Sequence, residues 1–479
     1  MTPGRWLRVL LGLTAALAAD AQEGLRIGDA VAAGLAVHRS VVEAEAGARS
    51  AALALHLAEI DYSGVTVTLS ATPAASVDLT PLRSGTFSDV VDTFSVGAGG
   101  TVTAALGLPW GMEITGSYTG EFDLDGPEPV ADSLIDTHSL SFSQDLLPSA
   151  GLAASALALS ERQDQLRLAR LRLWRARNDV ALNVARTFLA LTSRQVTLGL
   201  EERRLTFAER DLAHTRMRVE QQAADRLDLI DATIAVAEQR NAIAEQRAVL
   251  DLDLAEFLAD LDLAPRALVV PEADLRALRQ NARALLREPA SPGVIGAAPE
   301  VLEAAVALAN AELRAERAHA GLLPELSLSL DYRKSRSASR PGSLSLSITG
   351  SYPLYDSGRG AVVSEQAQEQ AASARRSLTS TRTSVERAFE RARLELRSAL
   401  TAEELARLRL ERAHLRLERA RRRHDAGAIS DSALEEAAVQ LSEAEVGART
   451  AALALGSAYL SLAGDLGLDL QQELSAITR

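Results

Sequence analysis

The sequence predicts an α+β membrane protein built from two copies of one unit, in which short strands lead into a very long helix. Three observations carry this prediction. The order helix, strands, long helix, polar break and return helix occurs twice along the chain. Most aromatic residues lie within or beside segments that alternate Ser or Thr with apolar residues. The N-terminus has the features of an export signal.

Residues 1–21 are predicted to be a signal peptide. Arg5 and Arg8 precede the apolar stretch 9–18, and Ala19-Asp20-Ala21 fits a small-x-small cleavage site. The alternative is a buried N-terminal helix. After Ala21 no apolar run approaches the ~20 residues that a membrane-spanning helix needs. We therefore expect the mature protein to enter a bilayer as strands.

The composition argues against several functional classes. The chain of 479 residues has no Cys, so disulfides and thiolate metal sites are excluded. Its net charge of −13 disfavours a nucleic-acid partner. The seven His are scattered without metal-ligand spacing. The sequence therefore predicts no enzyme: no catalytic, cofactor-binding or metal residues are expected.

The boundaries follow from the repeated order. The first copy spans 22–263, with strands at about 62–145 and a long helical hairpin at about 151–263. Residues 264–298 are rich in Pro and form a linker with a short helix near 274–287, an expected equatorial element. The second copy spans 299–468, with strands at about 325–352 and a hairpin at about 361–466, and 469–479 is a C-terminal tail.

Four segments alternate with period two, which places their apolar and hydroxyl side chains on opposite sheet faces. They are 65–72, 139–143, 326–332 and 344–349. A half-buried soluble sheet would alternate in the same way, but flanking aromatic residues are typical of an outer-membrane barrel. Four strands cannot close, and an open edge is forbidden in lipid, so three chains supplying twelve strands are expected. A further hairpin at 96–122 is either an external loop or extra barrel strands.

The helices carry a coiled-coil pattern. In the segment 151–222, apolar residues recur every seven positions: Val184, Leu191, Leu198, Leu205, Leu212 and Val219. Some 70 residues give a rod of roughly 105 Å. In the second copy, Leu408/Leu415 and Leu410/Leu417 keep the same spacing. Two shorter helices in each copy together have the length of the long one. This predicts a tube wall in which one long helix lies beside two stacked shorter helices. The alternative is a soluble scaffold of coiled-coil hairpins.

Three motifs carry a family resemblance. Ser351-Tyr-Pro-Leu-Tyr-Asp-Ser-Gly-Arg-Gly360 resembles the strand-to-helix junction of TolC-like outer-membrane efflux proteins, and Ser143-Gln-Asp-Leu-Leu-Pro-Ser-Ala-Gly151 looks like its first-copy version. The segment 424–437 resembles the family's periplasmic hairpin tip. The resemblance assigns the junction to Pro353, Gly358 and Gly360 in the second copy and to Pro148 and Gly151 in the first.

The resemblance implies a homotrimer whose outer-membrane barrel continues as a periplasmic helical tunnel. Its implied role is the exit duct of a tripartite efflux or type I secretion system, which passively conducts drugs, solutes or proteins. The implied partners are a periplasmic adaptor (membrane fusion) protein, an inner-membrane transporter and outer-membrane lipid. The alternatives are an exported periplasmic adaptor or a structural scaffold. Two complete copies disfavour the adaptor, which normally carries one hairpin.

The family's narrow entrance is lined by acidic residues just after each tip. The resemblance places Asp228 and Glu436 there. Ala433 occupies the second position of the second copy at which the family has an acidic residue, so that acid is missing here. Asp231 lies three residues after Asp228, hence on the same helical face. Alternatively, these acids only suit the positive end of the helix dipole. A carboxylate ring would concentrate cations.

Other tip residues depart from the family pattern or add to it. Gln222 stands where the family favours Gly, and His424 and Ile429 replace residues that lock the family's closed entrance. Gly427 is the predicted turn glycine of the second tip. Arg421, Arg422 and Arg423 are expected to contact the adaptor; the alternative is a solvated helix face.

Overall fold

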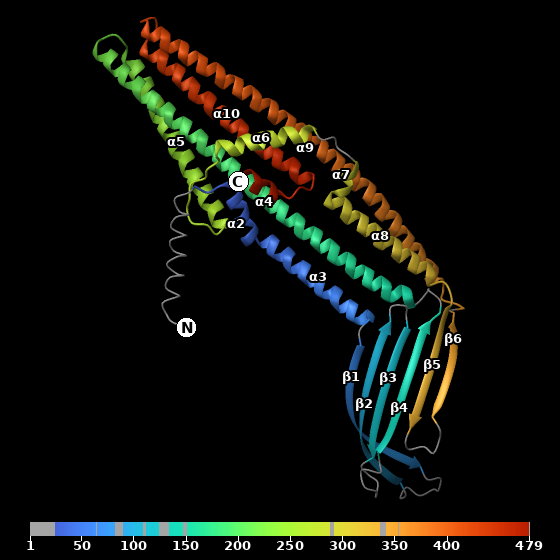
Figure 1. The fold of residues 1–479 in the computed structure, drawn as a ribbon. Helices are drawn as coiled ribbons and strands as arrows, with labels where there is room; N and C mark the ends of the chain where they lie inside the picture. The colour runs from blue at the N-terminus through green and yellow to red at the C-terminus, as the bar shows by residue number, and fades with distance from the viewer. Residues whose placement is uncertain are drawn as a thin grey trace, which may run out of the picture. The chain divides into compact units, whose positions relative to one another are not determined.

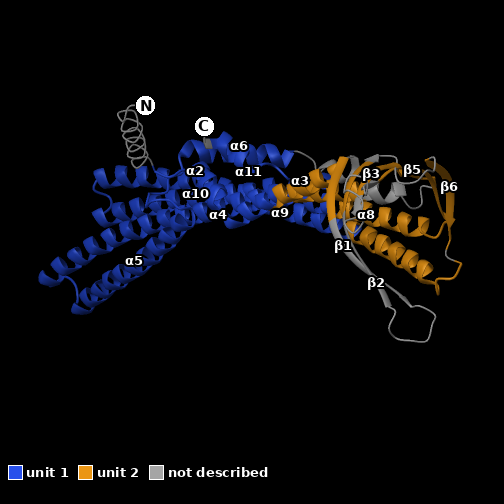
Figure 2. Ribbon diagram, turned by 90° about the horizontal axis from the view of Figure 1, so that it is seen from below, with its two compact units in different colours: residues 1–46, 171–303, 379–479 blue, residues 47–170, 304–378 orange. Residues whose placement is uncertain are grey.

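The computed structural model describes residues 24–63, 65–81, 90–108, 112–123, 134–146, 151–287, 292–335, 342–352 and 354–478. The predicted signal peptide lies outside the described residues. The chain divides into two compact units, coloured separately in Figure 2. Unit 1 comprises Met1–Ala46, Leu171–Glu303 and Thr379–Arg479, and unit 2 comprises Gly47–Arg170 and Ala304–Leu378.

The described elements follow the predicted order twice (Figure 1). They are α2 (Ile27–Val37), α3 (Arg39–Ser63), β1 (Val65–Pro81), β2 (Val90–Leu108), β3 (Met112–Asp123), β4 (Leu134–Asp145), α4 (Gly151–Glu220), α5 (Arg226–Asp260), α6 (Glu272–Arg287), α7 (Pro292–Ala297), α8 (Pro299–Ala320), β5 (Glu325–Ser335), β6 (Ser343–Ser351), α9 (Arg359–Asp425), α10 (Asp431–Asp465) and α11 (Leu470–Thr478).

The two copies align with fixed numerical offsets. The return helices α5 and α10 are both 35 residues long, and 226 + 205 = 431 relates their first residues. Before the sheet the offset is larger, because α3 and α8 begin at 39 and 299 and β1 and β5 begin at 65 and 325, so that 299 − 39 = 325 − 65 = 260. The first copy therefore holds 260 − 205 = 55 additional residues between its first and last strands.

Those additional residues contain β2 and β3. Among the described residues the sheet has six strands in the order β1-β2-β3-β4-β5-β6, all neighbours antiparallel, instead of the four that the alternation predicts. The hairpin expected at 96–122 is part of the sheet, since β2 pairs with β1 on one side and β3 pairs with β4 on the other. Gly97, Gly99 and Gly100 interrupt the alternation of β2, which is why its pattern was ambiguous.

The register gives the sheet two chemically distinct faces. On the face we call the apolar face, one row of paired residues crosses all six strands: Val65, Leu106, Ile114, Phe142, Leu330 and Leu346. The opposite, hydroxyl face carries the row Ser70, Thr101, Thr119, Thr137 and Ser335. Hydroxyl pairs bond across strands there, with Oγ–Oγ distances of 2.7 Å for Ser329–Ser347 and 3.2 Å (Oγ1–Oγ1) for Thr101–Thr119.

In unit 1 the first half of the predicted heptad seam of α4 is buried, while Leu205, Leu212 and Val219 are only half-buried. Val184, Leu191 and Leu198 lie in the core and face a second seven-residue series on α5 that the sequence analysis did not identify: Val236, Ile243, Leu250 and Phe257. Phe188 of α4 packs edge-on against Phe257, with ring centroids 6.4 Å apart. No described helix has a stretch long and apolar enough for a membrane span.

Of the two seven-residue series predicted on helix α9, the one through Leu410 and Leu417 is buried and the one through Leu408 and Leu415 is exposed. Phe389, Leu396, Glu403 and Leu417 are buried at multiples of seven, and Leu410 is half-buried in the same series. The predicted pair Leu408 and Leu415 is instead 63% and 59% exposed. Both series satisfy the spacing rule, so only packing against neighbouring helices distinguishes them.

Helix α6 contacts two long helices of unit 1, α10 and α9. It crosses α10 at Gly456, where a Cβ atom would lie 3.1 Å from Leu278 Cδ1. On the α9 side, Arg279 forms a buried ion pair with Glu403 at 2.5 Å. The expected C-terminal tail forms α11, because Leu470 and Leu474 are buried and Asn178 Nδ2 donates to the Leu468 carbonyl at 3.0 Å.

Candidate functional site

The tip of the first hairpin turns through a residue with left-handed backbone. Gln222 has φ +59°, and the Ala223 N–H donates to the Arg218 carbonyl at 2.7 Å. This bond satisfies one of the carbonyls left free at the end of α4. A non-glycine residue adopts this conformation at a cost of about 1–2 kcal/mol. Gln222 therefore forms the turn of the tip although it stands where the family favours Gly.

The second tip repeats that geometry with glycine. Gly427 has φ +70°, and the Ala428 N–H donates to the Arg423 carbonyl at 2.8 Å. The offset of 205 relates Gln222 to Gly427 and Arg218 to Arg423, so the two turns are structural equivalents. Gly427 therefore occupies the turn position predicted for it, where glycine avoids the steric penalty.

The two return helices begin with different caps. In α5 the Asp225 side chain accepts from the Arg226 N–H at 2.9 Å, and the Asp228 carboxylate accepts from the Asp225 N–H at 3.1 Å, completing a capping box. In α10 the Ser430 hydroxyl accepts from the Ala433 N–H at 3.4 Å. Asp228 is thus the N3 acid of a capping box, and its side chain is exposed; its place at the channel entrance stays a prediction.

Asp231 and Glu436 are the acids that the two tips share. The offset of 205 places Asp231 opposite Glu436 and Asp228 opposite Ala433. Both shared acids are exposed, and Glu436 accepts from Gln440 Nε2 at 3.3 Å within its own helix. Neither forms an ion pair with a described residue. An equivalent acid in both copies was recognisable only once the turn residues had been matched.

The remaining predicted tip residues lie together around the second turn. His424 Nε2 is 2.5 Å from Asp431 Oδ1, which ties the end of α9 to the start of α10. Arg421, Arg422 and Arg423 are exposed, and Arg422 lies 3.8 Å from Glu418 of its own helix. This arginine cluster is therefore accessible on the described surface.

Ion pairs that the sequence analysis missed connect the two hairpins. Arg210 of α4 lies 3.0 Å from Glu435 of α10, one residue before Glu436. Further from the tip, Arg204 contacts Glu443 at 2.6 Å, a hydrogen bond that raises the pKa of the guanidinium. Only the tertiary arrangement reveals these pairs, because their partners are more than two hundred residues apart.

In unit 2 the junction after β6 is organised by Asp356. Its carboxylate accepts from the Gly360 N–H at 2.7 Å and the Gly358 N–H at 2.9 Å, and these bonds lower the pKa of the carboxyl. Gly358 has φ +80°, and a Cβ at Gly360 would lie 2.8 Å from Leu322. Both glycines are therefore required by the turn. Asp356 went unrecognised, although an Asp before a helix is a capping signal.

Of the other predicted junction residues, only Gly151 is described. Gly151 is the first residue of α4. Pro148 and Pro353 lie outside the described residues. The first-copy junction therefore remains a prediction.

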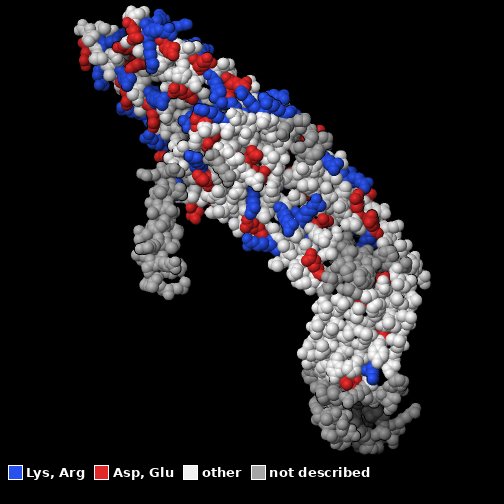
Figure 3. Space-filling view, viewed as in Figure 1, with Lys and Arg blue, Asp and Glu red and all other residues white. Residues whose placement is uncertain are grey.

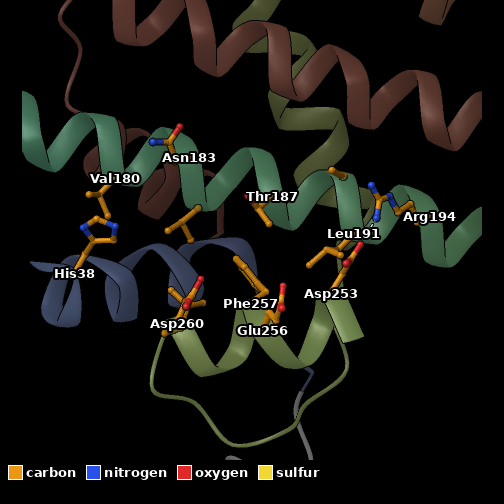
Figure 4. A pocket seen from close by; sticks show the side chains of 13 residues that line it. His38, Val180, Asn183, Thr187, Leu191, Arg194, Asp253, Glu256, Phe257 and Asp260 are labelled. Atoms are coloured by element: carbon orange, nitrogen blue, oxygen red, sulfur yellow. Dashed lines mark hydrogen bonds and ion pairs between the residues drawn. The ribbon is translucent and has the colours of Figure 1, made fainter. Parts of the chain in front are cut away.

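A cavity of about 470 Å³ lies between α4 and α5 and beside His38, the residue after α2, away from the tip residues (Figure 4). His38, Asn183, Asp253, Glu256 and Asp260 are among its lining, and Arg194 pairs with Asp253 at its side. Within the described chain, no three His, Cys, Asp or Glu are placed to hold a metal. The cavity therefore contributes no identified chemistry.

The second copy is similar to a known protein family. Residues 294–468 match the family model described as Outer membrane efflux protein. The second copy is therefore similar to the domain that this model describes. The resemblance predicted from the junction and tip motifs is thereby confirmed. No curated protein matches the chain.

Solved membrane channels and outer membrane proteins are similar in fold across nearly the whole chain. CusC has a TM-score of 0.63 at 15% identity, covering 92% of each chain. VceC of Vibrio cholerae has a TM-score of 0.60 at 14% identity, covering 92% of this chain and 96% of that one. The CmeC outer membrane channel of Campylobacter jejuni has a TM-score of 0.60 at 12% identity, covering 95% and 89%. The predicted α+β fold class is confirmed, with a larger sheet.

Proposed function

We propose that the chain is the exit duct of a tripartite efflux or secretion system, an outer-membrane channel that conducts solutes passively. The observation that carries the proposal is the two-faced sheet. Its apolar face is exposed on β1 at Val65, Val67 and Leu69 and on β6 at Leu344, Leu346 and Ile348. An exposed apolar face opposite a hydroxyl face suits lipid on one side and a wet lumen on the other.

The charge distribution supports the same assignment. In Figure 3 charged side chains are dense over the helices, while the visible described strands are largely uncharged. The helical part is thus suited to the aqueous periplasm and the sheet to a bilayer. The outer membrane efflux protein domain at residues 294–468 supports this location independently.

A homotrimer is the proposed working form. In the single chain, β1 and β6 are sheet edges, and unpaired edges are not tolerated in lipid. Helix α9 also exposes Leu394, Leu405, Leu408 and Leu415. Apolar residues at this density on one long helix suit a helix from a second copy. The proposed further partners are a periplasmic adaptor and an inner-membrane transporter; the exposed tips and Arg421–423 are the proposed adaptor contacts.

The channel mouth is proposed to lie at the hairpin tips. Three copies would each bring Asp231 and Glu436, giving six carboxylates around the entrance, with Asp228 near by. Such a ring attracts cations and repels anions. No reaction is assigned to these residues, since their role is electrostatic.

The decisive test is single-channel current from the detergent-extracted mature protein in a planar bilayer. Discrete, long-lived steps are expected, and a variant lacking both tips should give larger steps if the entrance limits the current. Absence of current from both proteins would contradict the duct and favour a periplasmic scaffold or adaptor, which should instead be soluble without detergent.

A matched pair of variants tests the lipid-facing assignment. Leu346→Arg places a charge on the apolar face and is expected to reduce outer-membrane assembly, since such a charge costs ~2–4 kcal/mol at the bilayer midplane. Ser345→Arg, one residue away on the hydroxyl face, should assemble normally. Equal assembly of the two variants would exclude a bilayer on the apolar face.

A further inference from the structure

The first copy differs from the second by a two-strand insertion within the sheet. The offset between copies is 260 up to β1 and β5 and 205 from the tips onward, so 55 residues are inserted. They include β2 and β3, whereas β6 is the next described strand after β5. The family-model match covers residues 294–468, the copy without the insertion.

The inserted strands β2 and β3 lie between β1 and β4 in the sheet. β2 pairs with β1 from Val65↔Leu106 to Pro81↔Val90, and β3 pairs with β4 from Met112↔Gln144 to Phe122↔Leu134. β1 and β4 are consequently not neighbours. An external loop would leave them paired with each other.

The inserted strands also continue both faces of the sheet. Val102 and Tyr118 continue the apolar face at Leu69, and Thr101 and Thr119 continue the hydroxyl face at Ser70. A one-residue shift in register would exchange the two faces, so this agreement is a strong constraint. The strands β2 and β3 thus carry the same lipid-facing and lumen-facing pattern as the others.

The insertion leaves the outer edges compatible with each other. Six is an even number, so β6 runs antiparallel to β1. Both edge strands alternate in the same way, with Thr66 and Thr68 on β1 and Ser345 and Ser347 on β6 facing the hydroxyl side. Pairing β6 of one copy with β1 of a second copy therefore continues both faces.

We infer that each chain contributes six strands to the barrel and that three chains close an eighteen-stranded barrel through β6–β1 pairing, since 3 × 6 = 18. The copy number rests on the proposed function; the six-strand contribution rests on the register. Barrel diameter grows roughly linearly with strand number. The lumen would therefore be about half as wide again as a twelve-stranded one.

Disulfide mapping tests the strand order, and the absence of native Cys removes background. Ser70 pairs with Thr101 on β2, whereas Thr137 lies in the same row on β4. Disulfides need Cα atoms within ~7 Å. Neighbouring strands satisfy this limit, while strands three apart lie roughly 14 Å away.

The experiment oxidises Ser70→Cys/Thr101→Cys and Ser70→Cys/Thr137→Cys variants in isolated outer membranes and counts free thiols by maleimide-polymer gel shift. We expect the first pair to lose its thiols and the second to keep them. A disulfide in the second pair would overturn the inference, because β1 would then adjoin β4 as in a four-strand contribution. Absence of a disulfide in the first pair would overturn it as well.

Closure is tested between copies. Thr66→Cys is combined in turn with Ser345→Cys, Ser347→Cys and Thr349→Cys, and at least one pair should give a covalent trimer on non-reducing gels. A covalent assembly of any other size, or none from the three pairs, would refute closure by three copies. Failure of the duct itself is seen separately, as loss of bilayer current from a protein whose disulfide map is unchanged.

Discussion

Asp231 and Glu436 occupy the same position in the two hairpins, each six residues after the N-cap residue of its return helix, Asp225 or Ser430. Asp228 has no acidic counterpart, because Ala433 fills that position. Of these acids, Asp228 is also engaged in a capping box. The shared pair is therefore the better candidate for a continuous ring of charge.

The first prediction follows from that pairing. The double variant Asp231→Asn/Glu436→Gln should lower cation over anion selectivity and weaken block by trivalent cations, measured from reversal potentials in a salt gradient. Glu435→Gln is the matched control, because its carboxylate is paired with Arg210. Unchanged selectivity in the double variant would remove both residues from the mouth.

The second prediction concerns the left-handed residues of the tips. Gln222→Gly should slow hydrogen exchange of the Ala223 amide, and Gly427→Ala should accelerate exchange of the Ala428 amide. A steric penalty of about 1–2 kcal/mol corresponds to roughly 5–30-fold in the opening equilibrium. Gly447→Ala, within α10 and with open space at its Cβ, is the control and should leave both amides unchanged.

The third prediction is a pH dependence at the junction. The Gly360 and Gly358 amides lower the pKa of Asp356, so its contribution to stability is present above the unfolded-state pKa of about 3.9. That contribution is lost as the pH falls through the lowered folded-state pKa. Wild type should exceed Asp356→Asn in thermal stability at neutral pH, and the difference should vanish in strong acid. A constant difference at all pH values would show that charge is not involved.

The fourth prediction separates the apolar seam from the ion pairs of unit 1. Phe188 is fully buried against Phe257, so Phe188→Ala should destabilise by about 3–5 kcal/mol. Arg204 is 42% exposed, so Arg204→Gln should change stability by no more than about 1 kcal/mol. Thermal unfolding followed by helical circular dichroism compares the two variants. An equal loss in both would mean that the ion pairs contribute more than exposure allows.

Much of the fold could be predicted because periodicity is local information. The α4 heptad through Val184, Leu191 and Leu198 and the alternation of β5 and β6 both reflect one face meeting a different environment. The exposed Leu408 and Leu415 show the limit of this argument. Seven-residue spacing identifies a stripe on a helix, but it does not say whether the stripe meets the same chain or another.

The candidate site was less predictable, because its contacts join distant segments or depend on backbone conformation. Gln222 takes a conformation usually reserved for glycine, so its type gives no signal for the turn. Asp356 could have been predicted as a capping residue, because it is an Asp that lies just before the start of helix α9. The place of β2 in the sheet could not be predicted from its alternation, because Gly97, Gly99 and Gly100 carry no side chain that distinguishes the two faces.

The crossing of α6 over α10 at Gly456 has a mechanical consequence. Because Gly456 has no side chain, the Leu278 side chain of α6 lies directly against the α10 backbone. Helix α6 is also tied to α9 through Arg279 and Glu403, so this point resists sliding. From Gly456 to Ser430 there are 456 − 430 = 26 residues of helix α10 and its cap. That length is a lever arm of roughly 39 Å, so a 10° rotation about the crossing would carry the tip through about 7 Å.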